Sequence, residues 1–252
     1  HPMKLRMLTA SLALAAGLGI APASQALDLG NLAGGLVNLA KAATLSDDDA
    51  KELAFDAAQH MDSQNKIAPP NSPYAKRLAR IVKGLNQEDG LALNFKVYLT
   101  KEVNAFAMAN GTVRVYAGLL DAMTDDEVRF VIGHEVGHVK LGHSKKAMQV
   151  AYTASGVRGL AAASGNQAVA QLSASAIGGF AEALVNAQFS QSQENEADTY
   201  SVGFMKRHNY PPAAAVSALR KLQALGDGAS ILSSHPASSE RATKVESEIA
   251  KL

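Results

Sequence analysis

The stretch from Val131 to His143, VIGHEVGHVKLGH, holds two histidines separated by three residues, with a glutamate directly after the first. On an α-helix, residues four apart lie one above the other, so His134 and His138 would present their rings to one metal ion. Glu135 would lie about 100° farther round the helix, where it can act on a water molecule at the metal instead of binding the metal. The pattern therefore requires a helix here and indicates a zinc site.

Flanking residues set the ends of this helix. Thr124 and Glu127 form a capping box at its start, and Gly142 is expected to follow its last turn. Most of the other predicted helices begin at a serine or proline that can cap or start a helix. They are expected at about 46–63, 72–84, 188–207, 211–225 and from 238 onward.

One small antiparallel sheet is predicted in the middle of the chain. Phe95, Val97 and Leu99 alternate with more polar residues, which is the period of a half-buried strand. Two β-prone runs then flank Asn110 and Gly111, a pair typical of a type I′ hairpin turn. Together these patterns predict an α+β fold that is predominantly helical, with a small antiparallel sheet and the histidine motif on a helix.

Composition narrows the metal chemistry and the partners. The 252 residues are 47% hydrophobic, and they include neither tryptophan nor cysteine. The absence of cysteine rules out disulfides and thiolate-bound zinc, which leaves histidine and carboxylate ligands. The formal net charge is +1, so we expect no nucleic-acid partner.

The N-terminal residues predict an exported protein. His1 and Pro2 are taken as a non-native remnant, and residues 3–26 combine two cations, a short apolar run and a small-residue cleavage site, as a signal peptide does. The alternative is an uncleaved anchor, but the apolar run is shorter than the ~18 residues of a spanning helix. Residues 27–45 are expected to form a flexible leader, and residues 46–252 a single domain.

The third protein ligand has to come from farther along the chain. His143 lies five residues after His138, roughly 140° away around a helix, and is expected to make a polar contact near the helix end instead. In QENEAD, Glu194 and Asp198 are four apart and share a helix face, whereas Glu196 points about 200° away from Glu194. We predict Glu194 as the ligand and Asp198 as the acceptor for the second ring nitrogen of a ligand histidine. The alternative is a solvated acidic helix.

Three segments, GHEVGHVKLGHS, QFSQSQENEAD and SSHPASSERA, occur in this order and resemble the zinc metallopeptidase family of HtpX and the CAAX prenyl endopeptidases. The similarity is greatest to the periplasmic LoiP-like branch and extends from about Leu45 to the C-terminus. It implies a gluzincin-type metallopeptidase core that binds one Zn²⁺ per chain through His134, His138 and Glu194, with Glu135 as the base.

The resemblance also implies a cellular role. Members of the branch degrade unfolded or misassembled cell-envelope proteins, and envelope chaperones or other proteases are candidate partners. Members are commonly anchored through a lipidated cysteine, which this chain lacks. We therefore expect a periplasmic protein that is soluble or peripherally associated with a membrane. No motif predicts its oligomeric state.

The expected reaction is hydrolysis of a peptide bond by a zinc-activated water, with Glu135 as the general base. Asn104, Ala105 and Phe106 resemble the edge strand of thermolysin-like enzymes, with which an extended peptide could pair. An ordinary hairpin edge is the alternative for this segment.

The rival function is a non-catalytic, zinc-stabilised chaperone or assembly factor that binds extended peptides. The intact glutamate favours an enzyme, because a structural zinc site needs no base.

The SSHPASSERA segment supplies two further candidates. His235 precedes a predicted helix start, Arg241 lies in the early turns of that helix, and the family resemblance places the segment over the zinc. We predict that one of the two donates a hydrogen bond to the oxyanion that develops during hydrolysis. As an alternative, His235 could occupy the fourth zinc position in a resting enzyme. Whether the Ala/Gly/Ser-rich segment Tyr152–Val185 covers the cleft as a lid is left open.

Overall fold

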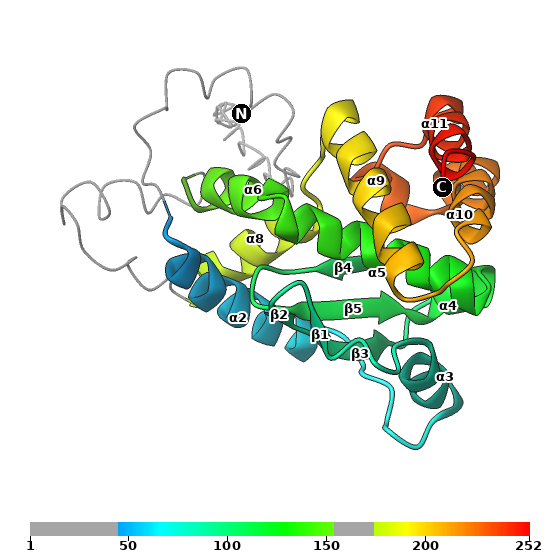
Figure 1. Cartoon of the computed structure of the whole chain (residues 1–252). Helices are drawn as coiled ribbons and strands as arrows, with labels where there is room; N and C mark the ends of the chain where they lie inside the picture. Colours follow the sequence, from blue (N-terminus) through cyan, green and yellow to red (C-terminus); the bar gives the residue numbers. More distant parts are fainter. Residues whose placement is uncertain (1–44, 154–173) are drawn as a thin grey trace, which may run out of the picture.

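The computed structural model describes residues 45–153 and 174–252 (Figure 1). The predicted signal peptide and all but the last residue of the predicted leader lie outside the described residues. The described helices are α2 (Asp47–Gln64), α3 (Pro73–Ile81), α4 (Ala117–Ala122), α5 (Asp125–Lys140), α6 (His143–Tyr152), α8 (Ala174–Val185), α9 (Gln191–Arg207), α10 (Ala213–Leu225) and α11 (Ser239–Ile249). The strands are β1 (Gln87–Glu88), β2 (Leu91–Ala92), β3 (Asn94–Tyr98), β4 (Ala105–Ala107) and β5 (Thr112–Tyr116).

The helices predicted from capping residues are present, and the structure adds others. Ser46, Ser72, Thr124 and Ser238 each accept a hydrogen bond from a backbone N–H in the first turn of the helix that follows. Helices α4, α6 and α8 were not predicted; the residues before α4 and α6, Tyr116 and Gly142, make no side-chain capping hydrogen bond. Among the described residues, no helix is both long and apolar enough to cross a membrane.

The main sheet has the strand order β3-β5-β4 and is mixed, so the predicted antiparallel sheet is wrong in part. β4 and β5 pair antiparallel as a hairpin, but β3 runs parallel to β5. The Asn110-Gly111 turn predicts only the pairing of β4 with β5, because turn residues determine how two consecutive strands pair. They do not determine on which side of β5 the earlier strand β3 lies. As a consequence, β4 lies at the edge of the sheet.

The turn of the hairpin also differs from the predicted type I′ turn. That type needs positive φ at both central residues, but Gly111 has φ of 89° while Asn110 does not have positive φ. The backbone N–H of Gly111 donates to the carbonyl oxygen of Met108 at 2.9 Å, which closes the turn one residue earlier. A Cβ atom on Gly111 would lie 1.7 Å from the carbonyl oxygen of Ala92, so only glycine fits against β2.

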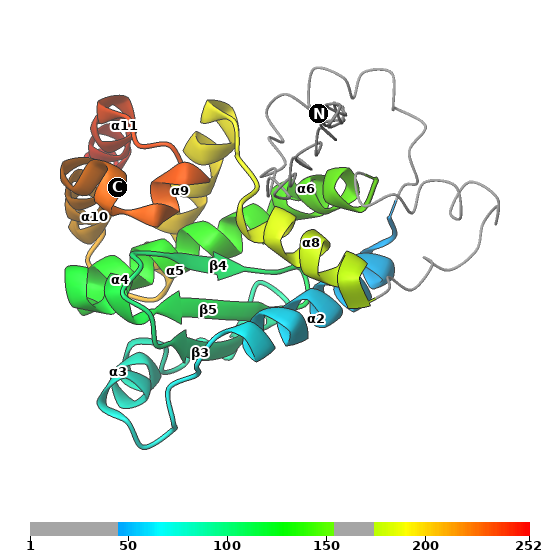
Figure 2. The same ribbon diagram turned by 180° about the vertical axis from the view of Figure 1, so that it is seen from behind.

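Helix α5 forms the centre of the molecule and is buried along most of its length. Both hydrogen bonds of the predicted capping box are present: the Thr124 hydroxyl accepts from the Glu127 N–H, and the Glu127 carboxylate accepts from the Thr124 N–H. α5 packs against α9, α10 and β4. In both views α2, α6 and α8 gather at one end of the molecule and α10 and α11 at the other (Figures 1 and 2).

A close approach at Gly133 brings α9 onto α5. A Cβ atom there would lie 2.4 Å from Phe204 Cδ1 and 2.5 Å from Ser201 Oγ, both on α9. The Ser201 hydroxyl donates to the carbonyl oxygen of Phe130 at 2.6 Å, which ties the two helices together at this point. Because Gly133 directly precedes His134, this contact sets how close the acidic residues of α9 lie to the histidines of α5.

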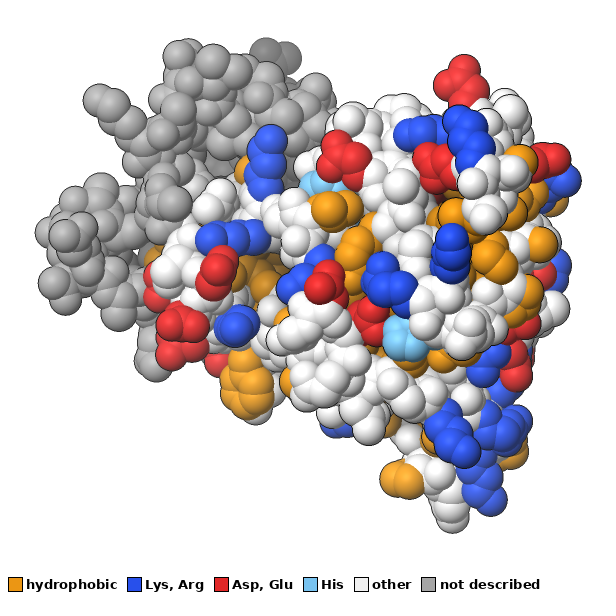
Figure 3. Space-filling model, in the orientation of Figure 1, with side chains coloured by type: hydrophobic (Ala, Val, Ile, Leu, Met, Phe, Trp, Pro, Cys, Tyr) orange, Lys and Arg blue, Asp and Glu red, His pale blue; other side chains and the backbone are white. Residues whose placement is uncertain are grey.

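Acidic and basic side chains are both distributed over the face seen in Figure 3. α3 and the turn after it contribute three exposed basic residues, Lys76, Arg80 and Lys83, at the corner occupied by this helix.

Candidate metal centre

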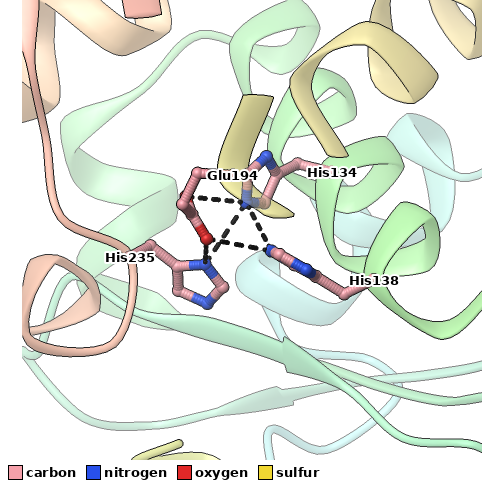
Figure 4. Close-up of side chains that lie close together, drawn as sticks. All are labelled: His134, His138, Glu194 and His235. Carbon is pink, nitrogen blue, oxygen red and sulfur yellow. Dashed lines mark hydrogen bonds and ion pairs between the residues drawn. The ribbon is translucent and has the colours of Figure 1, made fainter. Parts of the chain in front are cut away.

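Four buried side chains from three parts of the chain converge at one point (Figure 4). His134 and His138 come from α5, Glu194 comes from α9, and His235 comes from the segment before α11. One ligand atom from each residue lies within 4.8 Å of the others. All four are at least nine-tenths buried. The structure therefore brings together the three predicted ligands and one of the two residues predicted to act on the oxyanion.

The spacing of these atoms fits a tetrahedral metal site. Nε2 of His134 lies 3.0 Å from Nε2 of His138, 3.2 Å from Nδ1 of His235 and 3.4 Å from Oε2 of Glu194. Zinc binds nitrogen and oxygen at about 2.0–2.2 Å, so two ligand atoms at neighbouring corners of a tetrahedron lie roughly 3.3–3.6 Å apart. A single Zn²⁺ would thus lie within reach of every atom, with only small outward shifts of the ligands.

Two buried carboxylate oxygens that accept no hydrogen bond support the same fit. Among the described residues, Oε1 of Glu135 and Oε2 of Glu194 are buried and accept no hydrogen bond. Arg241 Nη1 lies 2.9 Å from Oε2 of Glu194, close enough for an ion pair but without hydrogen-bond geometry. A buried carboxylate oxygen without a hydrogen bond is unfavourable unless a cation or a water satisfies it.

The electrostatics of the site favour a positive charge at its centre. Burial alone would lower the pKa of His134, but the charge of Glu194 and the hydrogen bond to Asp198 outweigh it and raise this pKa to about 10 in the metal-free chain. Burial alone would raise the pKa of Glu194, but the charges of His134 and His235 hold it well below its ordinary range. The ionised carboxylate attracts a cation, and a bound metal can take the place of the proton.

Asp198 lies behind His134, as predicted for the residue that holds a ligand histidine. Its Oδ1 is 2.8 Å from Nδ1 of His134, so Nε2 is left for the metal. Arg241 donates to both oxygens of Asp198 at 2.8 Å. Arg241 also donates to the carbonyl oxygen of Pro236. Its guanidinium group therefore contacts Asp198 and Glu194, whereas the ring of His235 lies among the ligand atoms.

Comparison with known proteins identifies the family. Residues 73–249, more than half of the chain, match Peptidase family M48. The chain is 47% identical over 246 residues to Metalloprotease LoiP of Escherichia coli strain K12, which covers 96% of each chain. It is 45% identical over 217 residues to Metalloprotease YcaL of the same strain, 85% of each chain. The chain belongs to peptidase family M48.

A shorter similarity connects this M48 peptidase with the HtpX proteins named in the resemblance. Protease HtpX of Glaesserella parasuis is 36% identical over 81 residues, which are 30% of this chain and 29% of that protein. The family and its metalloprotease relatives make the chain a zinc-dependent metalloendopeptidase. The non-catalytic chaperone alternative is therefore set aside.

The M48 peptidase has a cavity beside the metal centre. Glu135 and His235 line it, together with residues of β4 and the turn after it. Of the three predicted substrate-binding residues, Phe106 lines the cavity. Asn104 and Ala105 are buried, and the side-chain oxygen of Asn104 accepts from the backbone N–H of Ala105 at 2.9 Å.

Residues outside the predicted site also contact it. Nδ1 of His143 lies 2.9 Å from Nδ1 of His138, and Nε2 of His143 lies 3.0 Å from the carboxylate of Glu196. The phenyl ring of Phe189 stacks on the His138 ring with centroids 3.8 Å apart. The sequence signal for His143 was its position five residues after His138. A polar contact was expected, but helical geometry did not identify its partner, since His143 begins the separate helix α6.

Proposed function

We propose that this M48 peptidase hydrolyses peptide bonds of unfolded or damaged cell-envelope proteins, with Glu135 as the general base. We further propose that it is exported to the periplasm, where it is soluble or peripherally associated with a membrane. Misassembled proteins would be its substrates, and envelope chaperones or other proteases are candidate partners. The signal-peptide pattern at residues 3–26 supports export.

The proposal is supported most directly by one observation: Glu135 and residues of strand β4 line the same cavity. Because β4 is an edge strand of the sheet, an extended peptide could pair with it and pass the base. Backbone pairing of this kind depends more on an extended conformation than on sequence. The rest of the cavity is largely apolar, and its apolar lining residues include Phe106, Met108, Met148, Leu184, Val185 and Phe189. Unfolded chains, which expose apolar side chains and free backbone, suit such a cavity.

His134, His138 and Glu194 would hold the zinc, which would supply Lewis-acid chemistry by polarising the scissile carbonyl and lowering the pKa of a water molecule. Glu135 would take the proton of the attacking water and later deliver it to the leaving amine. Burial raises the pKa of Glu135 above its ordinary value, against the opposing charges of His235 and His134. A raised pKa brings this carboxyl closer to neutral pH, where a general base and acid works best.

His235 would donate to the oxyanion as the carbonyl carbon becomes tetrahedral. Its Nε2 lies 3.3 Å from Oε1 of Glu135, so the ring reaches the region where the base must act. Arg241, which donates to Asp198 and lies 2.9 Å from Glu194, would act on the same step by holding these two carboxylates in place.

The test compares purified wild-type protein with the variant Glu135→Gln on unfolded casein. We expect the variant to retain one zinc per chain by elemental analysis and to lose cleavage by at least 100-fold, the low end of what a positioned base contributes. Glu182→Gln, which makes the same change at an exposed position of α8, serves as the control and should cleave at the wild-type rate. Wild-type cleavage by Glu135→Gln would show that another group is the base.

A further inference from the structure

We propose that His143 and Glu196 are positioning residues that orient His138 for zinc, a role that rests on the proposed ligand set. Nδ1 of His138 lies 2.9 Å from Nδ1 of His143, and Nε2 of His143 lies 3.0 Å from Oε2 of Glu196. The hydroxyl of Ser192 donates to the other oxygen of Glu196 at 3.2 Å. These contacts form a continuous chain from a buried ligand to the protein surface.

The chain of contacts allows one arrangement of protons when zinc is bound. Nε2 of His138 faces His134 and Glu194, at 3.0 and 3.1 Å, so Nε2 must be unprotonated to bind metal. The proton of the neutral ring then lies on Nδ1 and is donated to Nδ1 of His143. His143 in turn carries its own proton on Nε2 and donates it to the Glu196 carboxylate. Every ring nitrogen is thereby satisfied, and the tautomer of the ligand is fixed.

The surroundings of His138 leave this contact to select the orientation of its ring. The stacked ring of Phe189 restricts the plane of the imidazole but does not distinguish two orientations that differ by a flip about the Cβ–Cγ bond. The Nδ1 contact selects between them, because it fixes the direction in which Nε2 points. His143 itself is held at the first position of α6, directly after the Gly142 turn, and is 6% exposed.

The two helical ligands are therefore supported in different ways. His134 is backed by the buried Asp198, whose side chain is 2% exposed, whereas His138 is backed by an imidazole and then by Glu196, whose side chain is 54% exposed. A carboxylate in water holds its partner less firmly than a buried one. We therefore expect the removal of His143 to weaken zinc binding more than the removal of Glu196 does.

The test is zinc affinity, measured by competition with a chelator. His143→Ala should bind zinc about 10–100-fold more weakly than the wild type, the range found when the hydrogen-bond partner of a ligand histidine is removed. His143→Asn should recover much of this loss, because its amide oxygen lies near the position of Nδ1 and can accept the same hydrogen bond. Glu196→Ala should give a smaller loss of affinity, and the exposed control Glu182→Ala none.

A spectroscopic readout separates positioning from general destabilisation. In zinc-bound wild-type protein, a ¹H–¹⁵N spectrum of the imidazoles should show a protonated Nδ1 on His138 that is protected from exchange with water. In Glu196→Ala and His143→Ala this proton should exchange faster. Thermal unfolding of each zinc-free variant checks its folding, and Glu196→Ala, a surface change, keeps the test valid should His143→Ala not fold.

Wild-type zinc affinity and proton protection in both alanine variants would overturn the positioning role. That result differs from failure of the proposed function, in which wild-type protein would bind zinc in the same titration but leave casein intact.

Discussion

Asp198 Oδ1 lies 2.8 Å from Nδ1 of His134, and both oxygens of this carboxylate accept hydrogen bonds from Arg241. Burial alone would raise the pKa of Asp198, but the hydrogen bonds from Arg241 and His134 hold it below its ordinary value. The residue is therefore ionised at neutral pH, and we propose that its charge fixes the His134 tautomer that leaves Nε2 free for zinc.

Asp198→Asn should weaken zinc binding by about 10–100-fold, because the amide is uncharged and its NH₂ group cannot accept from Arg241. Chelator competition measures the effect. Asp227→Asn, the same substitution at an exposed position after α10, should leave zinc affinity unchanged. An unchanged affinity in Asp198→Asn would mean that the Asp198 charge does not support His134.

His235→Ala should lower kcat on casein by about 100–1,000-fold while zinc is retained, since one oxyanion donor is typically worth this much. The distance of 2.9 Å between His235 Nδ1 and Glu194 Oε1 places the ring among the ligand atoms. A rise in basal activity would contradict the donor role and identify His235 as a resting fourth ligand. Steady-state kinetics and zinc content, measured on the same preparation, distinguish the two.

Gly133→Ala should destabilise the fold by about 1–3 kcal/mol, the usual effect of overpacking a tight contact. The added methyl would meet Phe204 and Ser201 at 2.4 and 2.5 Å and push α9 away from α5. Zinc affinity should fall with stability, because Glu194 is carried on α9. Gly179→Ala in α8, where an added Cβ would meet no other side chain or distant backbone of the described residues within 4 Å, should be neutral or stabilise by up to about 1 kcal/mol. Urea unfolding measures both, and equal stabilities would refute the close-packing argument.

Asp62→Asn should make the protein less stable near pH 7 by about 1.5–3 kcal/mol, the range for hydrogen bonds to charged groups. Asp62 accepts two hydrogen bonds from the buried Arg114 and one from Tyr98. Burial alone would raise the pKa of Asp62, but these hydrogen bonds hold it below the ordinary 3.8.

The sign of the pH dependence follows from this lowered pKa. Because the folded state binds the proton less readily than the unfolded state, ionised Asp62 stabilises the fold above about pH 4. The stabilisation is lost as the pH falls through the lowered pKa. The difference between wild type and Asp62→Asn should therefore shrink on acidification, as followed by denaturant unfolding from pH 7 to pH 3. Asp56→Asn, exposed on the same helix, is the control, and a pH-independent difference would contradict the charge-based explanation.

The sequence by itself determined the parts of the site that depend on local geometry. The spacing of His134 and His138 fixes their common face once α5 is a helix, and Thr124 and Glu127 fix where that helix begins. Glu194 and Asp198 follow the same rule on α9. These relations hold because a helix repeats every 3.6 residues whatever its surroundings, so four of the residues in and around the metal centre could be named before any tertiary contact was known.

Tertiary structure alone decided how these segments meet. The side of β5 on which β3 pairs, and hence the position of β4 at the sheet edge, depends on how the whole chain packs and not on the hairpin signal of Asn110 and Gly111. The contact between His143 and His138 depends on the turn at Gly142 that starts a new helix, and the contact of His143 with Glu196 depends on the close approach at Gly133. Contacts between residues distant in the chain are set by packing of the assembled core, which no local periodicity encodes.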